Sequence, residues 1–249
     1  MWGSCGFLGA VLLAGAWFEH AGFAGFPTVL LAALVATALA MLALPEAPRA
    51  PVEHEPVSLR SALSGVIGLF AVLLLMQLSF GPYYGFFSLF LGELGWAPSA
   101  VGALWALAVV AEIVAFALLP AWQPRVAPLV LLELACALTA LRWLLTALLA
   151  DRIAWLVVAQ LLHFASFAVY HAVTVRLVLG AFPGRLAGRG QALHATVAYG
   201  IGGAAGVAAS GWLWDAAGSS SPFLFGAAAA TLAWIGTVWL GRRWVTRSA

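Results

Sequence analysis

The run Val101-Gly-Ala-Leu-Trp-Ala-Leu-Ala-Val-Val-Ala-Glu112-Ile-Val-Ala-Phe-Ala-Leu-Leu119 decides the fold class of this chain. Apart from Glu112 it carries no charge. At about 1.5 Å per helical residue it is long enough to cross nearly all of a hydrocarbon core that is ~30 Å thick. The run therefore predicts a transmembrane helix.

Comparable runs fill most of the remaining chain. Hydrophobic residues make up 64% of it and charged residues 8%, with a mean hydropathy of +1.04. A β-barrel would show short segments of alternating polarity, whereas these runs are continuous. We therefore predict an all-α polytopic membrane protein. Its eight transmembrane helices are expected at 3–18, 27–44, 61–91 with a break, 101–119, 129–149, 153–179, 191–214 and 222–240.

The longest polar stretch, 45–60, separates the first two predicted spans from the last six. It contains Pro45, Pro48, Pro51 and Pro56 among charged residues, a composition typical of a linker. The predicted organisation is a first bundle at 1–44, a cytoplasmic linker at 45–60, a six-helix bundle at 61–242 and a cytoplasmic tail at 243–249.

The arginines predict the orientation. With the N-terminus inside, one side of the membrane receives only Arg152, and the cytoplasmic side receives Arg49, Arg60, Arg125, Arg185, Arg189, Arg242, Arg243 and Arg247. This asymmetry matches the positive-inside rule, so both termini are expected in the cytoplasm. The expected location is the cell (inner) membrane.

Ionisable residues inside the spans are the candidates for function, because polar groups in a bilayer need a partner or a water-filled cavity. Glu112 lies about 16 Å into its span, close to the midplane. It would either bind a proton or pair with a cation; a structural hydrogen bond between helices is the alternative. His163 and His171 lie on one predicted helix about 80° apart, loosely on the same side, where they could line one cavity or pack between helices.

The third predicted span is interrupted at Phe80-Gly81-Pro82-Tyr83-Tyr84-Gly85. A broken helix at membrane depth is tolerated where it lines a cavity or is buried in protein. We expect Tyr83, Tyr84, Gln77 and Tyr199 to line a substrate cavity; an ordinary proline kink is the alternative.

Two further features are interpreted as structural. Gly202, Gly206 and Ser210 recur every four residues, a spacing that permits close helix packing in lipid. Arg142 lies in the outer half of its span, where its side chain could reach the interface.

Several classes of function find no support in the sequence. It has no nucleophile elbow, HExxH motif or Walker lysine, since all eleven basic residues are arginine. No basic patch predicts nucleic-acid binding, and the histidine spacing does not suit a metal site. We therefore expect no enzyme activity, cofactor or metal. An intramembrane enzyme would need a reactive dyad that the sequence does not offer.

A family resemblance is carried by several runs of sequence. They are the segments 83–96 and 101–112, Leu141-Arg142-Trp143, the segment 162–171, Arg189-Gly190-Gln191 and the opening Trp2-Gly3-Ser4-Cys5-Gly6-Phe7. Together they resemble the 3-phenylpropionate transporter group of the major facilitator superfamily, which is similar to the nucleoside and lactose proton symporters. The chain departs from that pattern at Phe80-Gly81-Pro82, where members often carry a polar residue.

The resemblance implies a major facilitator fold that lacks about the first four helices. It also implies secondary active, proton-coupled uptake of a small organic solute such as an aromatic acid. Glu112 would be the protonation site with His163 or His171 assisting, and the partners would be the solute, protons, the lipid bilayer and the missing N-terminal helices. A nucleoside or sugar proton symporter and a truncated, non-transporting membrane binding or assembly protein are the alternatives.

Overall fold

The structure, a computed structural model, describes residues 23–43 and 59–248 together with positions 3, 6–10, 13 and 17. Side chains in the main part are described from residue 66 to residue 242. Of the predicted linker at 45–60, positions 45–58 lie outside the described residues.

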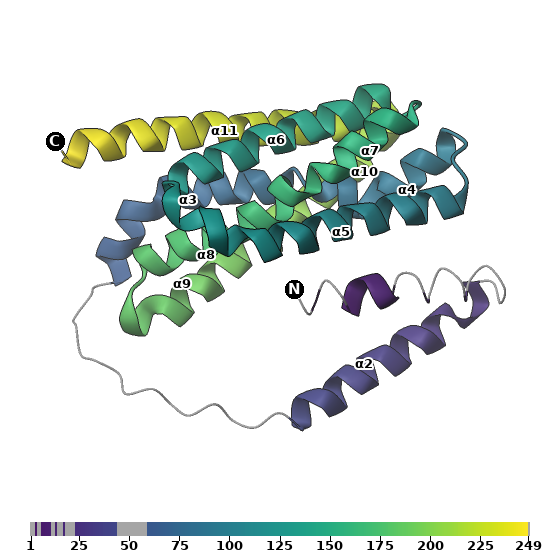
Figure 1. The fold of residues 1–249 in the computed structure, drawn as a ribbon, viewed down its shortest axis with the longest axis horizontal. Coiled ribbons are helices and arrows are strands. Elements are labelled where there is room, and N and C mark those ends of the chain that lie inside the picture. The colour runs from purple at the N-terminus through teal and green to yellow at the C-terminus, as the bar shows by residue number, and fades with distance from the viewer. Residues whose placement is uncertain are drawn as a thin grey trace.

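Six long apolar helical stretches form one bundle in the described part of the chain (Figure 1). Each is long and apolar enough to cross a membrane, so this is a multi-pass membrane protein. Two of them are single helices, α6 (Pro128–Leu149) and α11 (Ser221–Ser248). The other four combine α3 (Leu59–Leu78) with α4 (Gly81–Glu93), α5 (Pro98–Trp122) with η2 (Gln123–Arg125), α7 (Ile153–Leu161) with η3 (Phe164–Val169) and α8 (Tyr170–Ala181), and η4 (Gly184–Leu186) with α9 (Ala187–His194), η5 (Ala195–Gly202) and α10 (Gly203–Ala217).

The two N-terminal spans are described less completely. The described positions between 3 and 17 are helical, and η1 (Phe23–Gly25) leads into α2 (Phe26–Leu42). α2 is apolar but shorter than the six long spans, at 17 residues, and has no buried residue. The count of eight transmembrane helices therefore stays a prediction.

Proline and glycine set several of the helix boundaries. Pro98 and Pro128 open α5 and α6 directly after alanines in the extended conformation, where the missing proline N–H costs nothing. Gly95 and Gly218 have positive φ values of 82° and 90° at the ends of α4 and α10, a backbone that glycine adopts without strain. α11 differs from the sequence prediction. It continues to Ser248 rather than ending near Leu240, because no residue between Arg242 and Ser248 is a helix breaker.

The six-span segment of the chain begins and ends at the same end of the bundle (Figure 1). The start of α3, the end of α11 and the connections that follow α5 and α8 all belong to this end. Among the described side chains it carries Arg125, Arg185, Arg189 and Arg242, whereas Arg152 lies at the opposite end. We call it the arginine-bearing end.

The predicted break in the third span is present. α3 ends at Leu78 and α4 begins at Gly81, with Pro82 in its first turn. Pro82 has no N–H to donate to the carbonyl of Leu78. That carbonyl instead lies against Gly206, where a Cβ would stand 2.3 Å from its oxygen.

A glycine contact, formed by Gly81, Gly202 and Gly206, joins α3 and α4 to η5 and α10. A Cβ on Gly81 would lie 2.1 Å from the carbonyl carbon of Gly206, and one on Gly202 would lie 2.8 Å from the carbonyl oxygen of Leu74. The close helix packing predicted for Gly202 and Gly206 is therefore present, and any side chain at these positions would force the helices apart.

Candidate functional site

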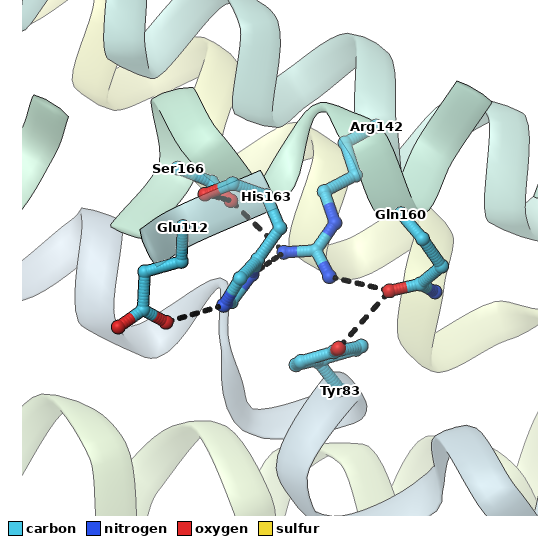
Figure 2. Close-up of polar contacts among 6 residues, drawn as sticks. All are labelled: Tyr83, Glu112, Arg142, Gln160, His163 and Ser166. Atoms are coloured by element: carbon cyan, nitrogen blue, oxygen red, sulfur yellow. Dashed lines mark hydrogen bonds and ion pairs between the residues drawn. The ribbon is translucent and has the colours of Figure 1, made fainter. Parts of the chain in front are cut away.

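A buried polar network joins side chains from several of the long spans (Figure 2). It joins Tyr83 of α4, Glu112 of α5, Arg142 of α6 and three residues of the following span, namely Gln160, His163 and Ser166. Arg142 is 0% exposed, and His163 and Glu112 are only 4% and 5% exposed. So many polar groups inside an apolar bundle are costly unless they bind one another, which makes the network a candidate functional site.

Arg142 is the centre of this network. Its NH1 group lies 2.9 Å from His163 Nδ1 and donates to Ser166 Oγ at 2.9 Å, and its NH2 group donates to Gln160 Oε1 at 3.2 Å. The guanidinium also lies 4.2 Å from the centre of the Tyr83 ring, within reach of a cation–π interaction. The expectation that Arg142 reaches the interface is wrong, because these acceptors hold its side chain inside the bundle.

The protonation of His163 follows from its two partners. Arginine has donors and no acceptor, so His163 Nδ1 accepts from Arg142. In the neutral ring the proton then resides on Nε2, which lies 3.3 Å from Glu112 Oε2. The order is therefore Arg142 donating to His163, and His163 donating to the Glu112 carboxylate. A neutral imidazole connects a buried cation to a buried anion.

Two buried donors of the network, Arg142 Nε and Gln160 Nε2, have no hydrogen-bond partner within the described part of the chain. Buried polar atoms are almost always paired in proteins, so an incompletely paired cluster is typical of a site that binds something.

A cavity of about 420 Å³ opens beside the network. Its ionisable lining groups are Glu112, His163 and His171, so the structure brings together one carboxylate and both predicted histidines. Most of the remaining wall is aromatic, made of Phe7, Tyr83, Tyr84, Trp105, Phe116 and Phe167. Such a wall suits a flat apolar group, and the three ionisable residues give it one polar side.

Gln77 and Tyr199 lie elsewhere than predicted from the sequence. Gln77 is buried where α3 meets η5, and a Cβ on Gly202 would touch its side chain at 3.4 Å. Tyr199 is not among the residues that line the cavity, but its hydroxyl lies 3.3 Å from Nδ1 of His171, which does line it. Tyr199 therefore adjoins the cavity through His171.

Sequence reasoning missed Gln160 and Ser166. They lie three residues before and three residues after His163, a spacing that places all three side chains on one helix face. This spacing of polar residues in an apolar span could have predicted that Gln160 and Ser166 share a site with His163. The aromatic residues Trp105, Phe116 and Phe167 had no such signal, because aromatic residues in an apolar span are usually packing residues.

The described residues contain no group of three His, Cys, Asp or Glu side chains that could hold a metal ion.

Substitutions at Tyr83 test how much of the network depends on its hydroxyl. That hydroxyl donates to Gln160 Oε1 at 3.0 Å. Tyr83→Phe should cost about 1 kcal/mol of stability, because Gln160 keeps its bond from Arg142. Tyr83→Leu also removes the ring beneath the guanidinium and should cost about 2 kcal/mol more. Thermal unfolding of the purified protein in detergent measures both, and equal losses would contradict the cation–π assignment.

Comparison with known proteins agrees with this architecture. The family model described as "MFS_1 like family" matches residues 1–225. The chain is also similar to the "Probable 3-phenylpropionic acid transporter" of Escherichia coli (strain K12), at 34% identity over 130 residues. That alignment covers 52% of this chain and 34% of the relative, so the chain matches about a third of the relative's length. No solved structure matches the chain. Because the family model covers most of the sequence, the chain belongs to the MFS_1 like family of major facilitator proteins.

Proposed function

We propose that this chain forms part of a secondary active transporter that takes up a small aromatic acid together with protons, by alternating access. The observation that carries the proposal is the buried Arg142–His163–Glu112 chain on the wall of an aromatic cavity. Membership of a transporter family and the similarity to a probable 3-phenylpropionic acid transporter support it. By the positive-inside rule the arginine-bearing end would lie in the cytoplasm. The proposed location is the cell (inner) membrane.

Protons enter the mechanism through His163 and Glu112. A second proton on His163 would occupy Nδ1 and turn this acceptor into a donor, so the bond from Arg142 would be lost and the two cations would repel. A proton on Glu112 removes the negative charge from the cavity wall and leaves Arg142 as the uncompensated charge of the network. Either event changes how three helices are held together, since α5, α6 and the α7–η3 span each contribute one residue.

The cavity wall also explains why an acid would travel with a proton. An aromatic acid has a ring for the aromatic wall and a carboxylate for the polar side, which contains Glu112. Two carboxylates at such a site repel each other, and one protonated carboxyl relieves the repulsion. Binding of the acid is thereby linked to binding of a proton, as symport requires.

The test is Glu112→Gln, which keeps the shape of the side chain and removes its titration. Uptake of radiolabelled 3-phenylpropionate into proteoliposomes under an inward proton gradient should fall at least tenfold. The matched control is Glu133→Gln on α6, because Glu133 does not line the cavity. Unchanged uptake by Glu112→Gln would refute the proton site.

A further inference from the structure

The cavity beside the Arg142 network differs in character along its length. The α5 residues that line it are Trp105, Val109, Glu112 and Phe116, and their spacing places them on one helix face. Trp105 lies seven residues before Glu112, which is about 10 Å closer to the end of the bundle opposite the arginine-bearing end (Figure 1). The cavity therefore has an aromatic end beside Trp105, and its ionisable groups lie at and beyond the level of Glu112.

Phe167, at the other end of the cavity, offers no free face to the ring of a solute. His163, four residues before it, stacks on it with 5.3 Å between the ring centroids and 25° between the planes. His171, four residues after it, stacks on it at 6.2 Å and 12°. Phe116 meets the rings of Phe167 and His171 edge-on, at 89° and 83°. These four rings occupy one another, which favours the Trp105 end as the place of a solute ring.

Contacts with α4 hold the Trp105 indole in place. Its Nε1 donates to Ser88 Oγ at 3.0 Å. The Tyr83 ring lies against it with 4.4 Å between the centroids, and the Phe87 ring meets it edge-on at 5.6 Å. Phe87 is buried in the core of the bundle, so the indole rests on packed side chains. Because three contacts fix its position, the indole forms a rigid part of the cavity wall.

Trp105 also closes the aromatic end of the cavity. Its hydrogen bond places Ser88 at the same level, and Ser88 lies one turn beyond Tyr84 along α4. Tyr84 lines the cavity, whereas Ser88 and Phe87 are not among its lining residues. On the span that begins with α7, the first lining residue is His163, which is level with its partner on α5. Among the described lining residues of these spans, Trp105 is therefore the outermost.

We propose that Trp105 determines how long a solute the cavity accepts, and that Ser88 is its positioning residue. The inference rests on the proposed function, because it concerns the same site and the same aromatic acid. The acid lies along α5, with its carboxyl group near Glu112 and its ring against the indole. Each further methylene group lengthens the acid by at most one carbon–carbon bond, about 1.5 Å, and presses its ring into a wall that cannot yield.

Competition binding measures the accepted length. Radiolabelled 3-phenylpropionate is bound to the purified full chain in detergent, and phenylacetate, 4-phenylbutyrate and 5-phenylpentanoate compete with it. We expect Trp105→Ala to raise the affinity for 5-phenylpentanoate relative to 3-phenylpropionate at least tenfold, because the vacated space admits the longer chain. Trp105→Phe keeps one ring and should give a smaller rise. A ratio of two affinities does not depend on the folded fraction, so partial unfolding would not imitate the effect.

Variants of Ser88 test its positioning role. Ser88→Ala removes the hydrogen bond of the indole without touching the cavity, and it should raise the same ratio a few-fold. Ser88→Thr keeps a hydroxyl and should keep the ratio of the unsubstituted protein. The matched control is Trp212→Ala, which removes an indole that is 70% exposed on α10 and should leave the ratio unchanged.

The outcomes separate this inference from the proposed function. An unchanged ratio in Trp105→Ala, with 3-phenylpropionate still bound, would refute the length limit and leave the proposed function intact. An unchanged ratio in Ser88→Ala alone would refute the positioning role. Competition by octanoate, an aliphatic acid, as strong as that by 3-phenylpropionate would instead refute the aromatic solute of the proposed function.

Discussion

Arg142→Met is expected to destabilise the protein more than any other single substitution in the buried network. The Glu112 carboxylate is only 5% exposed, and His163 connects it to the Arg142 cation. The substitution removes that cation and leaves the buried carboxylate without its counter-charge. Breaking a buried charge pair by removing one partner typically costs about 3–5 kcal/mol. Uptake should be lost as well, because His163 no longer has the donor that sets its tautomer.

The stability loss can be followed through a thiol dye during heating in detergent. Cys136 is free and fully buried, so it reacts only when the bundle opens, and a Cys5→Ala background removes the other thiol. The double variant Arg142→Met with Glu112→Gln should recover much of the lost stability and none of the uptake. An unchanged unfolding temperature in Arg142→Met would contradict the assignment of Arg142 as the counter-charge of Glu112.

Gly206→Ala is expected to have the second large effect. The new Cβ would lie 2.3 Å from the oxygen and 3.0 Å from the carbonyl carbon of Leu78. These are backbone atoms, so no change of rotamer relieves the contact, and α10 must move away from α3. Overpacking costs about 1–3 kcal/mol where side chains can adjust, and we expect the upper end of this range here.

Gly203→Ala is the matched control, since its Cβ would meet nothing within 4 Å on the same span. It should raise stability slightly, by roughly 0.5–1 kcal/mol, because alanine favours the helix. Gly81→Ala should resemble Gly206→Ala, and the two should not be additive because they separate the same pair of backbones. Equal unfolding temperatures for Gly203→Ala and Gly206→Ala would contradict the close approach.

The sequence was sufficient for the features that depend on local composition. Continuous apolar runs predicted the six long spans, and Gly81-Pro82 predicted the interruption between α3 and α4, because proline removes a specific hydrogen bond. The four-residue spacing of Gly202 and Gly206 predicted their packing role for the same kind of local reason.

Features that depend on which helices meet could not be predicted in the same way. Arg142, His163 and Glu112 belong to three different spans, and nothing in their spacing along the chain requires that they touch. On its own helix, the Arg142 side chain could equally well extend to the membrane interface. Only the acceptors that the next span packs around it show that it stays inside the bundle.

The π segments η3 and η5 also matter for how relatives are aligned. A π segment holds one residue more than the α-helical turns it replaces, so a relative with a regular helix there needs one residue fewer to keep the same faces inward. In a sequence alignment, a gap of a single residue inside 164–169 or 195–202 therefore reflects a real difference in helix geometry and is not an alignment error. Placing that gap elsewhere in the span would pair residues from opposite faces and hide the correspondence of His163, Ser166 and Tyr199 with their counterparts.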